Sequence, residues 1–408
     1  MELLDPSSSL RPSPVGLSSS DHYRTQIVRT PAEWQALEPE WRELHAASTA
    51  GEPALSWEWL SGWWRHYGPA YAREDALRVV LVRRGSELVG ALPLYLQRSY
   101  PMAPRRLLFL STGELEREET CPDYLDLLTR PGHEEAASRE VWSTLQGVTI
   151  GPWDELALRG AAADSLLLSG AARHMITGCA VETEPVSQCV IADLSGGFDA
   201  YLQGRSGSFR KQARRLLRAA EKEGLELSVA SGAAETRRYF GELVALHQRR
   251  WTAAGKPGVF SAPRFLEFHS ELAVRLGGAR RALLARLGRG DEALGVIYGF
   301  LAHGRFEFYQ CGIHAQAVGQ LESPGLALQL LLMQWLAEQG VREWDFLRGS
   351  AGYKSRFASR ERELVELTVR RHTMRNTAAR GARLSGRGVR KLLRSFHGGV
   401  VTGPAGSP

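Results

Sequence analysis

One stretch, from Arg305 to Phe357, constrains the fold more strongly than any other part of the chain. It begins with Arg305–Gly312, in which aromatic and polar residues alternate with the period of a β-strand. A long apolar segment, Ser323–Gln339, has the length and composition of a buried helix, and Val341–Leu347 is again β-like. A strand, a helix and a second strand in this order form a βαβ unit, whose two strands lie parallel in one sheet. The sequence therefore predicts an α/β fold with this unit at its centre.

The predicted helix has favourable residues at both of its ends. Ser323 suits the N-cap, Pro324 suits the first helical position and Gly340 suits the stop. The preceding loop is rich in glycine and small polar residues, so it would present free backbone N–H groups at the positive end of the helix dipole. Such a helix start binds anions, for example a pyrophosphate. The alternative is a well-capped βαβ unit that binds no ligand.

The residues of this unit resemble those of the GNAT acyltransferase superfamily. The resemblance rests on the order of two antiparallel strands, a third strand, Ser323-Pro324-Gly325, a long helix, Asp345-Phe346-x-x-Gly349 and Tyr353-Lys354. More narrowly, the chain is similar to acetyltransferase domains of the CelD, or cellulose-biosynthesis, type, a group that is itself similar to the FemABX aminoacyl transferases. The similarity extends from Tyr23 to Arg371 and is strongest between Leu246 and Phe357.

The resemblance implies an acyltransferase that uses acetyl-CoA or another acyl-CoA as the donor and an amine or hydroxyl as the acceptor. The donor pyrophosphate would bind to the loop from Gln316 to Gly325, and the pantetheine amides would bind to the open edge of Phe306–Gly312. The implied donor-binding residues are Tyr309, Gln316, Gly319, Gln320, Ser323, Gly325 and Leu326. Direct attack on the thioester needs no covalent enzyme intermediate, and we expect no metal.

Three residues after the helix are the predicted catalytic groups. Asp345 ends a predicted strand, and Tyr353 and Lys354 follow a short glycine-containing turn, so all three can reach one cleft. Asp345 could act as a base, Tyr353 could return a proton to the leaving thiolate, and Lys354 could stabilise a phosphate or an oxyanion. The alternative is a structural Asp–Lys pair with Tyr353 as a packing residue. A catalytic role predicts that Lys354→Ala and Asp345→Asn lose turnover while the thermal midpoint hardly moves.

Two other functions stay open. Gln316–Leu321 supplies only the first part of the GNAT pattern Q/R-x-x-G-x-G/A, which leaves room for a FemABX-like enzyme with an aminoacyl-tRNA donor. Against that donor, the chain lacks a coiled-coil arm and a strongly basic body. The other alternative is a non-catalytic accessory protein of polysaccharide synthesis. Retention of Asp345, Tyr353 and Lys354 argues against loss of catalysis.

Two segments are candidates for contact with the acceptor. Arg210, Arg214, Arg218 and Lys222 form a basic stripe at helical spacing, which predicts either an anion-binding platform or a solvated helix face. His247 and Trp251 lie four residues apart on one helix face. The family resemblance places them near the cleft as part of an LHxxRW signature, and the alternative is that they are packing residues.

A repeated pattern predicts two α/β units in the chain. The hairpin around Glu87…Gly90 matches the hairpin around Glu292…Gly295 at an offset of 205 residues, and a β-rich run follows each hairpin. We expect tandem GNAT-like units, each a mixed sheet flanked by helices. The predicted division is a disordered N-terminus at 1–20, a scaffold unit at 21–189, an acetyltransferase unit at 190–372 and a basic flexible tail at 373–408.

Composition limits the partners of the protein. The formal net charge is +6, but residues 373–408 carry seven Lys and Arg and no acid, so the rest of the chain is close to neutral. We therefore expect no specific nucleic acid partner. The four cysteines lack zinc spacing, and no signal peptide or membrane span is evident. We expect a cytoplasmic protein that acts on a small-molecule or glycan-precursor acceptor in polysaccharide or cell-envelope biosynthesis. The tail could make weak contact with a membrane surface.

Overall fold

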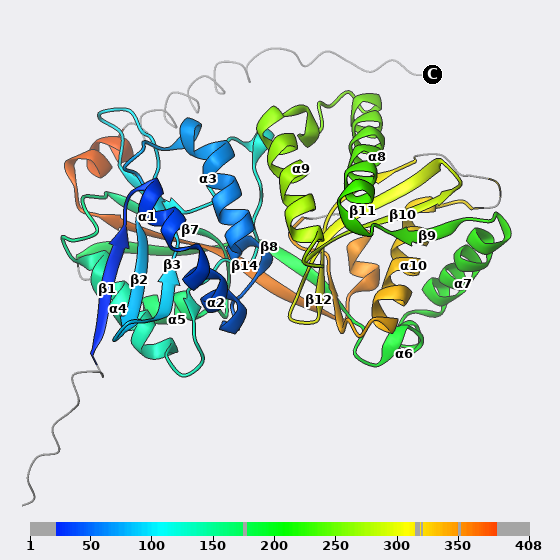
Figure 1. The fold of residues 1–408 in the computed structure, drawn as a ribbon, viewed down its shortest axis with the longest axis horizontal. Coiled ribbons are helices and arrows are strands. Elements are labelled where there is room, and N and C mark those ends of the chain that lie inside the picture. The colour runs from blue at the N-terminus through cyan, green and yellow to red at the C-terminus, as the bar shows by residue number, and fades with distance from the viewer. Residues whose placement is uncertain (1–21, 174–177, 315–318, 320, 350–351, 382–408) are drawn as a thin grey trace, which may run out of the picture.

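The structure is a computed structural model, and it describes residues 22–173, 178–314, 319, 321–349 and 352–381. Two halves lie side by side, and long strands run between them (Figure 1). The N-terminal half contains β1 (Tyr23–Val28), α1 (Pro31–Ala36), α2 (Glu38–Ala47), α3 (Trp57–Tyr71), β2 (Val79–Arg84), β3 (Glu87–Leu92), β4 (Leu94–Leu96), β5 (Arg106–Phe109), β6 (Leu128–Thr129), α4 (Glu134–Gln146), β7 (Glu155–Ala162) and α5 (Leu166–Arg173).

The C-terminal half follows the long strand β8 (Cys179–Asp193). It contains α6 (Gly197–Gln203), α7 (Gly207–Lys222), β9 (Glu226–Val229), α8 (Gly232–Ala253), α9 (Pro263–Gly277), β10 (Ala282–Arg289), β11 (Glu292–Ala302), β12 (Arg305–Ile313), α10 (Pro324–Glu338), β13 (Glu343–Asp345) and β14 (Arg360–Arg371). Short 3-10 helices cover Pro53–Leu55, Glu116–Glu118, Val259–Ser261 and Lys354–Phe357.

Within the described residues, the strands form two sheets. The four-stranded sheet has the order β1-β2-β3-β6, and the ten-stranded sheet has the order β4-β5-β7-β14-β8-β13-β12-β11-β10-β9. Pro93 separates β3 from β4, and since proline has no backbone N–H, it interrupts the strand there. One run of chain therefore contributes a strand to each sheet.

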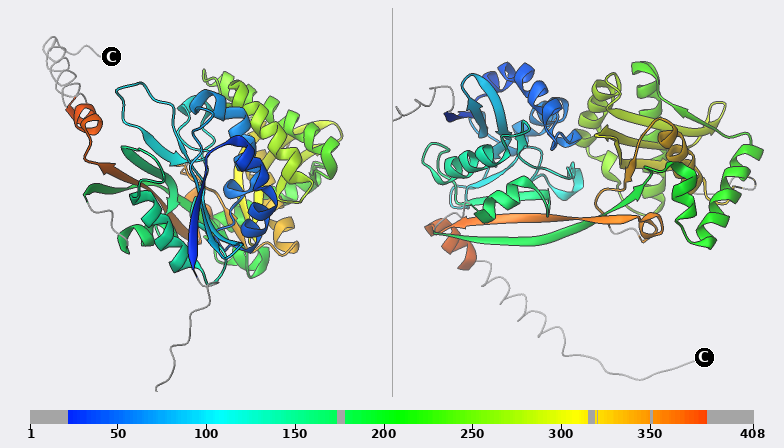
Figure 2. Two further views of the ribbon diagram at one scale, coloured as in Figure 1. Left: turned by 60° about the vertical axis from the view of Figure 1, so that its left-hand side comes forward. Right: turned by 90° about the horizontal axis from the view of Figure 1, so that it is seen from below.

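The strands β8 and β14 join the two halves. β14 pairs antiparallel with β8 over its whole length and with β7 of the N-terminal half over Leu364–Arg370. β8 in turn pairs with β13 of the C-terminal half through Ile191–Asp193. Figure 2 shows the two strands as one long ribbon beneath both halves. β14, the last strand that the structure describes, thus completes the sheet of the first half, and the expected boundary near residue 190 lies inside β8.

Helices add a second connection between the halves. α3 packs against α9, and the ring of Trp59 lies edge-on to Phe268 with 5.5 Å between the centroids. At the rim of this contact, His66 Nε2 lies 2.9 Å from the Glu271 carboxylate, and Arg65 forms an ion pair with the same group. Side chains of both halves therefore share one large apolar core.

The predicted βαβ unit is confirmed, because β12 and β13 pair in parallel on either side of α10. The strand expected over Val341–Leu347 is wrong in length, since only Glu343–Asp345 is extended. Leu347 has φ +52°, a left-handed conformation that ends a strand. Ser323 holds the N-cap position, but its side chain makes no capping hydrogen bond. Gly340, with φ +83°, fits its predicted place after the helix.

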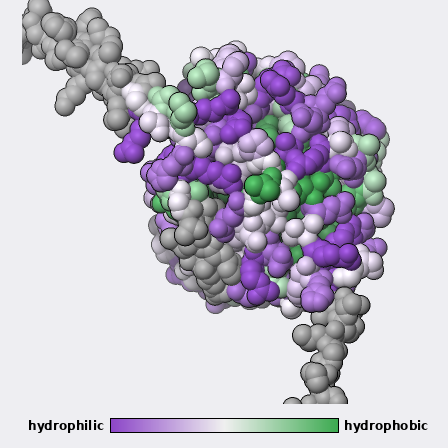
Figure 3. Space-filling model, turned by 90° about the vertical axis from the view of Figure 1, so that its left-hand side faces the viewer, coloured by the Kyte–Doolittle hydropathy of each residue, from purple (hydrophilic) through white to green (hydrophobic). Residues whose placement is uncertain are grey.

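Figure 3 shows the face at the N-terminal end of the molecule, where hydrophilic residues predominate and apolar residues form small groups. Of the helices that the structure describes, none is long and apolar enough to cross a membrane.

Candidate functional site

The site begins where two parallel strands separate. β12 and β13 pair only through residues 305–307 and 343–345. Beyond Glu307, β12 continues to pair with β11 as far as Ile313, but within the described residues its other edge has no strand partner. Unpaired N–H and C=O groups on such an edge can bind an extended ligand. The edge predicted over Phe306–Gly312 is therefore open only from Phe308 onward, because Phe306 and Glu307 pair with β13.

A cavity of about 440 Å³ lies at the end of this open edge. It lies between the end of β12, the start of α10 and the segment after β13, with α7 and α8 contributing further wall. The lining residues are Gln212, Arg250, Cys311, Ile313, His314, Glu322, Ser323, Pro324, Gly325, Leu326, Gln329, Tyr353, Arg356 and Phe357. Four predicted residues, Ser323, Gly325, Leu326 and Tyr353, thus meet in one place.

The start of α10 is shaped to accept a negative group. Its first turn carries no acidic residue, and the first backbone hydrogen bond of the helix is from Ala327 N to Ser323 O. The N–H groups of Gly325 and Leu326 precede that bond, so helix geometry leaves them without intrahelical partners. At Gly325 a Cβ atom would lie 3.2 Å from Ile313 Cγ2. Glycine therefore keeps this wall of the cavity open.

Two arginines supply positive charge to the cavity. Arg250 is exposed at the last turn of α8, and the described part of the chain offers it no ion-pair partner. Arg356 donates a hydrogen bond to Gln212 Oε1 and stacks 5.3 Å above the ring of Phe209. The acid at the rim, Glu322, is already paired with Arg215 at 2.7 Å. The cavity is therefore positively charged and suited to a phosphate-bearing ligand.

The inner part of the cavity is lined by neutral polar groups. Burial raises the pKa of the Cys311 thiol to about 11, so this thiol stays protonated at neutral pH. Burial also raises the pKa of Tyr353 to about 12, against a hydrogen bond with Gln329 that lowers it. Tyr353 keeps 40% of its surface exposed. Of the three predicted catalytic residues, Tyr353 is the one that lines the cavity.

Lys354 is close in sequence but its side chain points into the turn after β13. Its Nζ donates hydrogen bonds to the carbonyls of Phe346 at 2.9 Å, Leu347 at 3.3 Å and Arg348 at 2.9 Å. The side chain is buried, and burial lowers the pKa of the ammonium. An ammonium has three N–H donors, and all three are used by the turn. These contacts favour a structural role, and the catalytic role of Lys354 stays a prediction.

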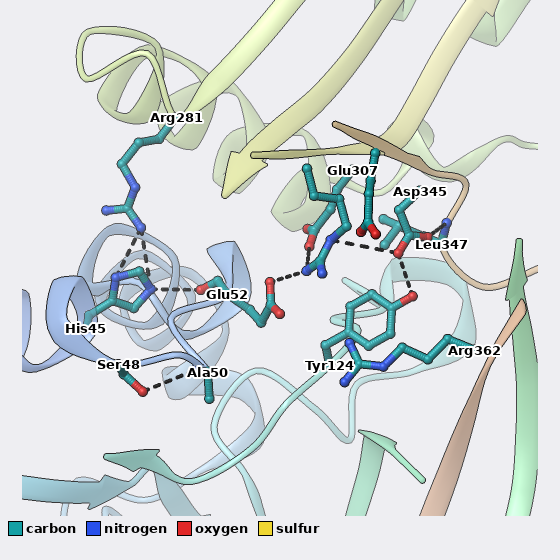
Figure 4. Close-up of polar contacts among 12 residues, drawn as sticks. His45, Ser48, Ala50, Glu52, Tyr124, Arg281, Glu307, Asp345, Leu347 and Arg362 are labelled. Carbon is teal, nitrogen blue, oxygen red and sulfur yellow. Dashed lines mark hydrogen bonds and ion pairs between the residues drawn. The ribbon is translucent and has the colours of Figure 1, made fainter. Parts of the chain in front are cut away.

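Asp345 lies at the junction of the two halves and is fully buried (Figure 4). Its Oδ2 accepts a hydrogen bond from the Tyr124 hydroxyl at 2.6 Å, and its Oδ1 accepts one from the Leu347 N–H at 2.7 Å. Burial raises the pKa of Asp345 to about 6, although the Tyr124 bond opposes that rise. Asp345 does not line the cavity described above. Its role as a base is therefore also left as a prediction.

A buried charged network surrounds Asp345 (Figure 4). Arg305 forms an ion pair with Glu52 of the N-terminal half, lies 3.0 Å from Glu307 and has its Nε 3.9 Å from Asp345 Oδ2. Burial and the neighbouring Glu52 raise the pKa of Glu307 well above its usual range. One guanidinium thus compensates carboxyl groups from both halves, which fixes their relative position at the end of β13.

The basic stripe on α7 does not reach the cavity through the predicted residues. Arg210 Nη1 donates to the carbonyls of Gln203 and Arg205, both at 2.9 Å, and so holds the loop before the helix. Arg214 is exposed. Neither Arg210 nor Arg214 lines the cavity, and their role in acceptor binding stays a prediction.

His247, Trp251 and Tyr309 also lie outside the cavity lining. His247 is buried against Phe260, with 4.9 Å between ring centroids, and burial lowers its pKa. Trp251 is 36% exposed, and the Tyr309 hydroxyl is engaged with Thr120 O at 2.7 Å and His269 Nε2 at 2.9 Å. The helix that carries the LHxxRW signature instead reaches the cavity through Arg250.

Three predicted donor-binding residues lie in the segment before α10, and several cavity residues were not predicted from the sequence. Gln316 and Gln320 lie outside the described residues, while Gly319 is described with φ +54°, next to the Glu223 carboxylate. Sequence reasoning missed Gln212, Arg250, Cys311, Gln329 and Arg356. Arg250 precedes the predicted Trp251, and Gln329 is one of two glutamines in a largely apolar helix, so both had a detectable signal. Among the described residues, no group of three or more His, Cys, Asp or Glu side chains could hold a metal ion.

Comparison with known proteins supports the GNAT assignment for the C-terminal half. Residues 207–355, which include the cavity, match the family model described as "Acetyltransferase (GNAT) domain". No curated protein matches the sequence. The narrower similarity to CelD-type proteins therefore stays a prediction, while a GNAT acetyltransferase domain is supported.

The solved structure of FemX confirms the predicted α/β fold class, and two further structures show a weaker likeness. The crystal structure of FemX is 11% identical, covers 85% of this chain and 96% of its own, and gives a TM-score of 0.56. The C-terminal domain (DUF2156) of a putative lysylphosphatidylglycerol synthetase from Agrobacterium fabrum is 12% identical, with coverages of 86% and 96% and a TM-score of 0.49. A tandem GNAT protein from the clavulanic acid biosynthesis pathway is 16% identical, with coverages of 85% and 98% and a TM-score of 0.44. At these identities the likeness concerns the fold alone.

Proposed function

We propose that this protein transfers an acetyl or other acyl group from acyl-CoA to an amine or hydroxyl of a small-molecule or glycan-precursor acceptor. The proposal rests on one observation: three features that suit such a donor lie at one cavity. These are the unpaired edge of β12, the acid-free start of α10 and the positive charge of Arg250 and Arg356. Together they match a ligand with an extended amide arm at one end and phosphates at the other.

In this proposal each residue has a defined task. The N–H groups of Gly325 and Leu326 bind the pyrophosphate, and the edge of β12 aligns the pantetheine arm. The acceptor heteroatom attacks the thioester carbonyl carbon, the carbon–sulfur bond breaks, and the acceptor loses its proton to a base or water. Tyr353 donates its hydroxyl proton to the departing thiolate and regains a proton from solvent. Lys354 and Asp345 support the turn that carries Tyr353.

An aminoacyl-tRNA donor is the second candidate, because the fold is similar to that of FemX and α7 presents basic side chains next to the cavity. Lys211, Arg214 and Arg218 are exposed on that helix, and the described residues offer them no ion-pair partner. Polyanion binding through such a face would weaken steeply with added salt.

The test is a titration of the full chain with acetyl-CoA and, separately, with aminoacylated tRNA, followed by calorimetry. The proposal expects a saturable CoA isotherm, with dissociation in the micromolar to millimolar range. It also expects release of free thiol from acetyl-CoA when a panel of amines and hydroxyl compounds is added. CoA binding without thiol release from any acceptor would favour the accessory binding protein. Binding of tRNA in place of CoA would identify the second candidate.

A further inference from the structure

A buried amide oxygen in the cavity lacks a partner. Gln329 lies on α10, lines the cavity and is only 7% exposed. Its Oε1 accepts no hydrogen bond from the described residues. The rest of the amide is engaged, because a hydrogen bond with Gln329 lowers the pKa of Tyr353. Buried amide oxygens almost always have a donor, and one left without a donor in a cavity points to a donor on the ligand.

The position of Gln329 indicates which part of a ligand it meets. Gln329 follows Gly325 by four residues, so both lie on the same face of α10. Cys311 on the unpaired part of β12 lines the same cavity. The free oxygen therefore lies beyond the phosphate-binding start of the helix, on the way to the point where β12 and β13 separate.

We propose that Gln329 Oε1 accepts a hydrogen bond from an amide N–H of the pantetheine arm, and that it selects donors that carry this arm. This inference rests on the proposed function and deepens it. A pantetheine arm has two secondary amides, and each offers one N–H donor. The phosphates offer only acceptors, which an amide oxygen repels. Gln329 would thus bind the arm from the wall opposite the backbone edge of β12.

The test compares two ligands on a variant that lacks the acceptor. Gln329→Leu keeps a side chain of similar length. It removes the unpartnered oxygen and the hydrogen bond to the half-exposed Tyr353, and neither loss should prevent folding. The probes are CoA and adenosine 3′,5′-bisphosphate, which lacks the pantetheine arm, each measured by calorimetry. The matched control is Gln334→Leu, because Gln334 is exposed on the same helix.

We expect Gln329→Leu to weaken CoA binding about tenfold, which corresponds to about 1.4 kcal/mol, and to leave binding of the bisphosphate unchanged. The control should bind both ligands as the wild type does. Normal CoA affinity in Gln329→Leu, or an equal loss for both ligands, would overturn the inference but not the proposed function. Failure of the wild-type chain to bind CoA would instead overturn the proposed function, and the inference with it.

Discussion

The two halves contain the same βαβ arrangement with opposite consequences. β5 and β7 pair in parallel on either side of α4, as β12 and β13 do around α10. The first turn of α10 has no acidic residue, whereas the first turn of α4 carries Glu134 and Glu135. Carboxylates at a helix start occupy the field that would otherwise attract phosphate. Under the proposed function, the same backbone arrangement binds the donor in the C-terminal half and not in the N-terminal half.

The space beyond the parallel strands differs as well. In the C-terminal half it is the cavity of about 440 Å³ at Gly325, whereas in the N-terminal half a smaller cavity of about 230 Å³ lies at Glu134, and residues 111–120, which follow β5, are partly buried. Thr120 Oγ1 donates to Ser111 O at 3.1 Å and to Glu114 at 2.7 Å, and Tyr67 donates to Glu118 O at 2.9 Å. These bonds hold residues 111–120, the filling segment, against the end of β5 and α3. The two halves therefore differ in the size of the space beyond the strands as well as in the charge of the helix start.

The largest expected effect concerns the turns that follow β7 and β13. Lys354 holds the second turn through three carbonyls, while Asp126 holds the first by accepting the N–H groups of Leu166 at 2.9 Å and Leu167 at 2.8 Å. Lys354→Met removes three charge-assisted bonds and leaves buried carbonyls without donors. We expect a loss of about 3–5 kcal/mol in the free energy of unfolding. Urea denaturation followed by fluorescence would measure it.

The matched control for this change is Lys211→Met, because Lys211 is exposed on α7. This variant should keep the wild-type stability within about 0.5 kcal/mol. If Lys354→Met instead lost turnover while its denaturation midpoint equalled that of the control, the turn would not depend on Lys354. The catalytic role predicted from the sequence would then be supported.

The next effect tests the filling segment through its buried carboxyl group. Burial raises the pKa of Glu114 from 4.5 to about 7, and its Oε2 accepts no hydrogen bond from the described residues. Because the folded state holds the proton more tightly than the unfolded state, stability falls as pH rises from about 4.5 to about 7. At pH 8 the charged carboxylate costs about 3 kcal/mol relative to pH 4.

Glu114→Gln removes this titration while it retains the shape of the side chain. The stability of the variant relative to wild type should therefore increase by up to about 3 kcal/mol between pH 4 and pH 8. Unfolding free energies of both proteins in urea, measured across this range, would show it. A constant difference between the two proteins would mean that Glu114 is not buried as a neutral acid and that the segment is looser than described.

A smaller effect is expected when α10 is given the acidic start of α4. Gly325→Asp places a carboxylate where the pyrophosphate would bind, and two like charges about 4 Å apart repel by roughly 1–4 kcal/mol. We expect donor affinity to fall about thirtyfold, which calorimetry with CoA would measure. Gly325→Ala separates bulk from charge, since its Cβ would meet only Ile313 at 3.2 Å.

Folding should survive this substitution, because an acidic residue in the first turn of a helix interacts favourably with its dipole. Wild-type CoA affinity in Gly325→Asp, with an unchanged denaturation midpoint, would place the phosphates elsewhere. A loss that Gly325→Ala reproduces in full would show that space, and not charge, distinguishes the two helix starts.

The sequence predicted those parts of the site that depend on local pattern. Alternation in β12 and the start of α10 at Ser323 follow from residues close to one another in the chain. The open strand edge was expected only from the family resemblance. The pairing of β14 with β8 was not predictable, since these strands lie far apart in sequence. The predicted residues of the basic stripe and of the LHxxRW motif do not line the cavity, because their side chains lie on other faces of α7 and α8. Arg250 lines the cavity, while its neighbour Trp251 does not.

The smallest expected effect comes from removing the acidic residues at the start of α4. Replacing Glu134 and Glu135 with glutamine removes the acidic start, but only the smaller cavity of about 230 Å³ is present there. Stability should fall by less than about 1 kcal/mol for each residue, since the helix start loses a favourable dipole interaction. Calorimetry should still give one CoA equivalent per chain, as for the wild type. A second equivalent in the variant would show that the charge of the helix start alone decides whether a half binds a donor. Residues 111–120 would then not prevent donor binding in the N-terminal half.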